Sequence, residues 1–174
     1  MITIKVNLGA ANFAERIANL AQDALQRVNL AVAKELKLIV VDMFDEENAA
    51  KRAKPWPNKA DGQPSNLTKT TTLRRSFFTD ATPEFGSVST QTEYAAKHQF
   101  GGDFDVPEHD RTIRQAWGRP IDPPKTIRVR AYKMTVPARP FFPFDDQGNL
   151  TPSAEQILVE TAEAGIEREL SRRQ

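Results

Sequence analysis

The chain opens with alternating apolar and polar residues and continues with apolar residues at helical spacing. The alternation over residues 1–8 predicts a half-buried strand. Asn12 followed by Glu15 is typical of a capped helix start, and apolar residues then recur with helical periodicity to about Asn48. We expect one long or kinked helix here. Residues 38–41 are β-branched enough to form a strand, but their flanks favour the helix.

The middle of the chain changes to shorter segments separated by proline and glycine. Trp56, which stands between two prolines, is interpreted as an anchor that holds a loop against the core. The glycine pair after residue 100 is typical of a helix end. The predicted elements are a loop over 51–66, a short helix over 67–76, a hairpin of 77–80 with 85–91, and a brief helix over 93–99.

Residues 103–124 show no useful periodicity and contain four prolines. We expect an irregular insertion there, mobile in the isolated subunit. A strand is predicted over 126–136, with Arg128 and Arg130 on one exposed face, and a final helix begins at Thr151. The sequence therefore predicts one α+β domain over 1–174: an N-terminal strand, a long helix, a small mostly antiparallel sheet and a C-terminal helix.

Composition limits the classes to which the chain can belong. A length of 174 residues suits one domain with a real core. No apolar run approaches the roughly 20 residues of a membrane span, and residues 1–6 lack the apolar core of a signal peptide. The absence of cysteine excludes disulfides and thiolate metal sites, and fits a product made in a reducing cytosol. We expect no membrane partner.

Charge is distributed unevenly although the net charge is only +1. Residues 51–75 hold seven Lys or Arg against one acid, and residues 111–139 hold eight against one, so the remainder of the chain is strongly acidic. The uneven charge has three possible explanations. The charged segments are simply solvated faces, or oppositely charged surfaces on neighbouring copies attract each other, or the basic segments face nucleic acid.

Patterns that carry chemistry are absent from the sequence. There is no phosphate-binding glycine loop and no zinc-protease motif. A metal site on His98 and His109 would need help from nearby carboxylates, and the turn over 145–149 lacks the ligand spacing of a calcium loop. We assign no catalytic residues, expect no cofactor, and interpret the chain as a protein that is not an enzyme.

Two short segments mix aromatic, glycine, proline and single charged residues in a way that no regular element requires. They are 94–102, Tyr-Ala-Ala-Lys-His-Gln-Phe-Gly-Gly, and 136–142, Val-Pro-Ala-Arg-Pro-Phe-Phe. Arginine and aromatic residues anchor protein interfaces. The alternatives are that His98 and the phenylalanines pack internally and that Arg139 pairs with an acid of the first helix. The residues predicted at interfaces are Tyr94, His98, Gln99, Phe100, Gly101, Arg128, Arg130, Arg139, Pro140, Phe141 and Phe142.

These two segments, in this order, resemble the signature of the phage virion morphogenesis family, the tail-completion proteins of Mu-like and related tailed phages. Trp56-Pro57 and the residues from Leu67 to Ser76 resemble upstream elements of that signature, with Thr71 or Thr72 where the family has glycine. The resemblance covers roughly residues 56–170.

The resemblance implies a structural phage protein that completes or terminates the tail and supports head–tail joining. It implies a self-assembled ring, a hexamer by analogy with tail symmetry, whose partners are the tail tube and neck or connector proteins, with passing contact with DNA. The implied location is the tail or neck of the virion, after assembly in the host cytoplasm. The alternative function is a nucleic-acid-binding accessory protein that uses the basic segments 51–75 and 111–139; a hydrolase has no supporting motif.

Overall fold

The structure, a computed structural model, describes residues 1–6, 21–59, 62–63, 67, 71–145 and 147–172. It confirms the mixed α+β class. The elements are β1 (Ile2–Val6), α2 (Gln22–Asp42), η2 (Glu46–Lys51), α3 (Thr72–Arg75), β2 (Phe77–Ala81), β3 (Gly86–Thr90), α4 (Ala95–Phe100), β4 (Gly102–Val106), β5 (His109–Ala116), β6 (Arg119–Val129), β7 (Tyr132–Val136) and α5 (Pro152–Ser171).

The body of the molecule is a three-stranded antiparallel sheet, order β1-β3-β2, packed against α2. The predicted hairpin is confirmed as β2 and β3, and its turn is held by Asn29, whose amide donates to the carbonyls of Thr82 (2.9 Å) and Pro83 (3.0 Å). At Gly86 a Cβ atom would lie 2.3 Å from the Asn29 carbonyl oxygen, so only glycine allows β3 to lie this close to the helix.

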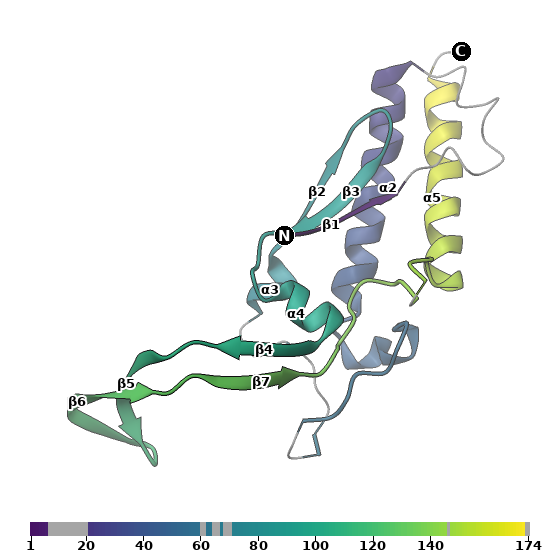
Figure 1. The fold of residues 1–174 in the computed structure, drawn as a ribbon. Coiled ribbons are helices and arrows are strands. Elements are labelled where there is room, and N and C mark those ends of the chain that lie inside the picture. The colour runs from purple at the N-terminus through teal and green to yellow at the C-terminus, as the bar shows by residue number, and fades with distance from the viewer. Residues whose placement is uncertain (7–20, 60–61, 64–66, 68–70, 146, 173–174) are drawn as a thin grey trace.

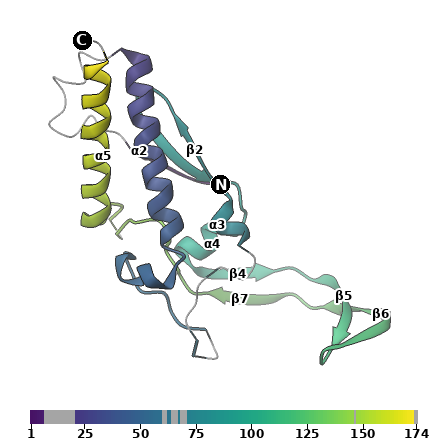
Figure 2. The same cartoon turned by 180° about the vertical axis from the view of Figure 1, so that it is seen from behind.

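The two long helices lie side by side and antiparallel, with α2 between the sheet and α5 (Figures 1 and 2). The helices approach closely at Gly165, where an added Cβ would lie 3.3 Å from a methyl of Val28. Beyond this contact the Glu169 carboxylate accepts hydrogen bonds from Arg27 (2.8 Å) and Arg172 (2.8 Å). None of the helices in the described ranges is long and apolar enough to span a membrane.

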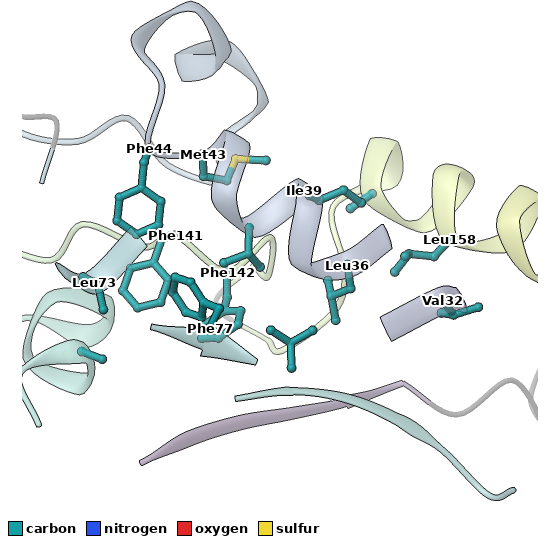
Figure 3. Packing of buried hydrophobic residues seen from close by; sticks show 14 of the residues in the cluster. Val32, Leu36, Ile39, Met43, Phe44, Leu73, Phe77, Phe141, Phe142 and Leu158 are labelled. Carbon is teal, nitrogen blue, oxygen red and sulfur yellow. The ribbon is translucent and has the colours of Figure 1, made fainter. Parts of the chain in front are cut away.

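The apolar core lies where α2 meets the sheet and the C-terminal third of the chain (Figure 3). Four phenylalanine rings gather there, with neighbouring centroids 5.0–6.0 Å apart: Phe44, Phe77, Phe141 and Phe142. Leu36 from α2 and Leu158 from α5 continue the cluster between the helices. The core therefore joins residues from nearly every part of the body.

A two-stranded ribbon over residues 102–136 projects from this body (Figures 1 and 2). β4 pairs with β7, and β5 pairs with β6 farther out; we call the whole ribbon the arm. The ribbon closes at its tip in a two-residue turn of Trp117 (φ 47°) and Gly118 (φ 77°), the conformation of a tight hairpin.

The arm corrects the prediction of an irregular insertion at about 103–124. Both strands of a two-stranded ribbon are edges, so proline is tolerated where its missing N–H would face solvent. Within β6, Pro120 pairs with Gln115, and Pro123 and Pro124 lie where the pairing with β5 shifts register and gives them no partner. The strand predicted over 126–136 is in turn broken at Arg130 and Ala131, between β6 and β7.

Other boundaries differ less from the predictions. The N-terminal strand, the brief helix α4 and the C-terminal helix are confirmed. The first long helix is described from Gln22, and its predicted start at Asn12 lies outside the described residues. Of the short helix predicted over 67–76, the described part is the single turn α3.

Candidate functional site

The two segments singled out in the sequence meet in space at the base of the arm. The backbone N–H of Arg139 donates to the His98 carbonyl at 2.7 Å. The side-chain oxygen of Gln99 accepts from the backbone N–H groups of Phe141 (3.0 Å) and Phe142 (3.1 Å). Because these bonds connect α4 to the segment over 137–142, we call this region the junction.

Gly101 is fixed at the junction by both conformation and space. Its φ of 65° and ψ of −164° belong to a backbone region that only glycine adopts readily. A Cβ atom there would lie 2.5 Å from the Ala138 backbone nitrogen, well inside contact distance. The first ladder pair of the arm, Gly102 with Val136, follows directly. The glycine therefore sets where the arm leaves the body.

Three residues predicted at interfaces are instead buried at the junction. Phe141 and Phe142 are part of the phenylalanine cluster, and Gln99 is buried beneath them. The two phenylalanines follow the internal-packing alternative left open by the sequence, and the Gln99 side chain accepts from both of their backbone N–H groups.

Trp56 fixes the outer side of the junction. Its indole N–H donates to the Pro140 carbonyl at 2.7 Å, and its ring packs edge-on against Phe44 with centroids 5.8 Å apart. The Arg52 guanidinium lies over the indole, 3.9 Å from the ring centroid. The predicted role of Trp56 as an anchor for its loop is confirmed.

Arg139 and His98 form the polar part of the junction. Nε of Arg139 and Nδ1 of His98 are both buried without a hydrogen-bond partner among the described residues. Arg139 also has no carboxylate partner within those ranges, so no described acid of the first helix pairs with it. Burial, and then the positive charge of Arg139, lower the pKa of His98 below its usual value.

Tyr94 and Phe100 are the exposed aromatic residues beside this pair. The Tyr94 ring meets the His98 ring edge to face, with centroids 5.7 Å apart, and remains partly exposed. Phe100, at the end of α4, is 72% exposed. A partly buried cation with free donors beside exposed aromatic rings is the composition of an interface anchor.

An open pocket of about 580 Å³ adjoins the junction. Its lining is mainly apolar and comes from β1, the end of α4 and the segment after the arm, and includes Ile2, Ile4, Phe100, Pro140, Phe142 and Phe144. Lys54 and Asp145 are the charged lining residues. Backbone N–H groups of Asn149, Gln147 and Gly148 help hold the pKa of Asp145 below its usual value, so this carboxylate stays ionised.

The arginines predicted on the arm lie away from the junction. Arg128 forms an ion pair with Glu108 across the ribbon, and Arg130 lies exposed where β6 gives way to β7. The sequence prediction missed the arm tip, where Trp117 is 99% exposed. Trp-Gly is not among the residue pairs, such as Asn-Gly, that signal a two-residue hairpin turn, and the nearby prolines interrupt the alternation of the strands.

The described residues contain no cluster of three or more side chains suited to hold a metal ion. His98 belongs to the junction, whereas His109 lies on the arm with Nδ1 2.9 Å from the Pro107 carbonyl. The junction offers hydrogen-bond donors, a cation and apolar surface, which are groups that bind another molecule.

Comparison with known proteins identifies one family. A model described as the phage virion morphogenesis family matches residues 9–163, which includes both segments of the junction and the whole arm. No curated protein matches the chain. No solved structure matches it either.

Proposed function

The chain belongs to the phage virion morphogenesis family, and we propose that it completes or terminates the phage tail and supports head–tail joining as a ring of identical subunits. A role in virion morphogenesis follows from the family. The finer assignment places the protein in the tail or neck of the virion, with the tail tube and neck or connector proteins as partners. It requires no cofactor and no catalytic residue.

The observation that carries this proposal is the arm over residues 102–136, which projects from a body with its own complete core. A ring subunit needs a rigid body to keep its shape and a separate surface to hold its neighbours. The junction supplies the link, because Gln99 and Gly101 fix the arm to the core. Unlike patches that meet head to tail close into a ring when the rotation between copies permits.

Complementation of a phage that lacks this gene tests the proposal. We expect infected cells to accumulate filled heads and separate tails, and a plasmid copy of the gene to restore joined particles. Electron microscopy of the purified protein, alone and with tail tubes, should show rings with the sixfold symmetry expected of a tail. Infectious, joined particles made without the protein would contradict the proposal.

Nucleic-acid binding remains a second proposal, and the arm supports it more strongly than the segment 51–75 does. In the other basic segment, 51–75, Arg52 stacks on Trp56 and Arg74 forms a bidentate ion pair with Asp45 at 2.6 and 2.7 Å. On the arm, by contrast, four basic residues of β5 and β6 are exposed and form no ion pair with a described residue: Arg111, Arg114, Arg119 and Lys125. Duplex DNA binding that weakens steeply with salt and is lost on replacing these four would favour this function.

A further inference from the structure

The arm exposes an apolar face along its inner half. In the β4–β7 register Phe104 pairs with Met134 and Val106 with Tyr132, so these side chains share one face with Val136. Tyr132 is 48% exposed and Met134 is 37% exposed. Among the described residues a single cation–ring contact reaches this face, from Lys97 Nζ to the Phe104 ring at 4.8 Å. The opposite face is polar, with Thr135 bonded to Asp103.

The tip of the arm ends in an exposed indole. Trp117 is 99% exposed, the most exposed of the large apolar side chains in the described ranges. Its positive φ of 47° is an unfavourable conformation for a bulky residue. Hydrophobic burial or internal contacts do not explain a tryptophan held here, so a partner is the physical reason that we infer for it.

A two-stranded ribbon is marginally stable by itself and gains stability when an apolar face is covered. In the described residues the outer half, β5 with β6, makes its main contacts within itself. A cover for the arm would therefore come from another molecule. The arm presents such a molecule with an apolar stripe and an aromatic tip, which are the features of an interface anchor.

Charge favours a second copy of this chain as that molecule. The outer part of the arm, residues 111–136, carries seven basic residues against one acid, whereas the inner part, residues 102–110, carries four acids and no Lys or Arg. The chain as a whole is nearly neutral, so the remainder of the sequence is acidic. Each copy therefore carries both a basic outer part of the arm and acidic residues that complement it on a neighbouring copy.

The pocket at the junction is the surface that fits the tip. It is open, largely apolar and large enough for an indole ring, and Phe100 at its edge is 72% exposed. Asp145 gives its lining a fixed negative charge, whereas Arg119 directly follows the tip turn. Lys54, the other charged lining residue, is already engaged in an interaction of its own.

We propose that the arm is an exchange element between subunits: Trp117 of one copy seats in the junction pocket of the next copy, and the apolar face of β4 and β7 lies along that neighbour. The inference rests on the proposed ring function and names the contact that builds the ring. The tip and the pocket lie at opposite ends of the arm, so the contact is head to tail. An open chain of subunits therefore keeps one unoccupied pocket and one unbound tip at its two ends until the ring closes.

Tryptophan fluorescence measures the contact directly. The chain has two tryptophans, and Trp56 is already buried at 7% exposure, so a change in emission on assembly reports Trp117. With increasing protein concentration we expect a blue shift in emission together with a rise in mass by light scattering. Assembly without any blue shift would show that Trp117 stays in water and would overturn the proposal.

Substitution gives the second measurement. Trp117→Ser should weaken self-association at least tenfold and leave the far-ultraviolet circular dichroism and the melting temperature of the subunit unchanged, because the side chain touches nothing within the described body. Leu38→Ser is the matched control, since Leu38 is 56% exposed on α2, away from the arm. Equal self-association by Trp117→Ser and the wild type would also overturn the exchange contact.

The absence of cysteine makes cross-linking clean. A double variant with Arg119→Cys and Ala138→Cys places one thiol beside the tip and one at the pocket, and leaves Trp117 in place. Oxidation should give covalent dimers and a ladder of larger species. Arg119→Cys combined with Leu38→Cys should not.

These results separate the two proposals. If the wild type forms rings while the Arg119→Cys, Ala138→Cys variant forms rings without a ladder, the exchange contact is wrong and the ring function stands. If the wild type stays monomeric both alone and on tail tubes, the ring function itself is wrong. A blue shift that requires purified tail tubes would assign the tip to the tail tube and reject a second copy as its occupant.

Discussion

The body buries its apolar side chains, whereas the arm leaves several of them exposed. In the body, α2, α5 and the three-stranded sheet bury their apolar side chains against one another, and Leu36, Val88 and Ile166 have no exposed surface. In the arm, two strands leave Tyr132 and Met134 partly exposed and Trp117 almost fully exposed. The apolar core of the body is buried within a single copy, whereas the arm leaves apolar side chains exposed, as interface surfaces do.

The junction lies between these regions and shares features of both. Gln99 is buried and bonded on the side of the body. Arg139, a few residues along the chain from Phe141, has a buried Nε without a partner in the described structure. Substitutions should therefore separate residues that stabilise the body from residues that contact another subunit and from residues of the junction that connect the two regions.

The largest effect is expected in the body. Phe141→Ala removes a fully buried ring that packs against Phe44 and Phe77, and should lower the free energy of unfolding by about 3–5 kcal/mol. Chemical denaturation measures this change. Trp117→Ala in the arm should change the same quantity by less than about 0.5 kcal/mol. Comparable losses in the two variants would mean that the arm is part of the cooperative core.

The next effect is expected at the link. Gly101→Ala combines an unfavourable backbone conformation with a clash against Ala138, and should cost about 2–3 kcal/mol in unfolding free energy. Gly118→Ala is the matched control, because it has a positive φ of 77° but no atom within contact distance of the added Cβ. It should cost about 1 kcal/mol. Equal effects would show that strain alone, without the clash, determines the need for Gly101.

Arg139 tests the assembly side of the junction. Arg139→Met keeps the apolar stem and removes a guanidinium that has no acidic partner in the described ranges, so the melting temperature should hardly change. If Arg139 meets a neighbouring subunit, each contact in the assembly should weaken by about 2 kcal/mol. Melting and head–tail joining are measured on the same variant, with Leu38→Ser as a control for the loss of exposed surface.

A fall in melting temperature that accompanies the loss of joining would assign Arg139 to the fold. Such a fall would reveal a buried partner outside the described residues, because an anion left without its arginine destabilises a core by several kcal/mol. Arg139 would then be withdrawn as an interface residue.

The sequence predicted those parts of the fold that local periodicity determines. The alternation at the N-terminus gives β1 over Ile2–Val6, and the two runs around Thr82 and the helical spacing after Thr151 give the predicted hairpin and helix. Trp56 was also interpreted correctly, since a large aromatic residue between two prolines has few other uses than to fix a loop. Each of these features depends on neighbours in the chain.

Features that depend on distant residues were not predictable. The arm went unrecognised because proline disrupts the alternation of a strand, and only the pairing of β5 with β6 shows that Pro123 and Pro124 lie at an irregularity of the ladder. The sequence indicated that the segments around His98 and Arg139 are special without showing that they touch. Phe141 points into the core, where its backbone N–H donates to Gln99, a contact between residues 42 positions apart that periodicity cannot reveal.

The smallest predicted effect is the pH dependence of the junction. The folded-state pKa of His98 lies below its unfolded value of about 6.5, because burial and then the charge of Arg139 disfavour the imidazolium. The unfolded chain therefore binds more protons between the two pKa values, and stability rises with pH across that window. This contribution is complete above about pH 6.5, falls as the pH drops below it, and becomes constant once the pH is below the folded pKa.

Melting temperatures at about pH 5 and about pH 7.5 measure this dependence. The wild type should lose more stability at the lower pH than His98→Gln, which cannot titrate at this position. In Arg139→Met only burial continues to lower the pKa of His98, so its pH dependence should fall between those of the other two proteins. An unchanged pH dependence of the melting temperature in His98→Gln would show that proton binding at His98 does not contribute to the stability of the body. The junction would then be independent of the core in stability although the two are in contact.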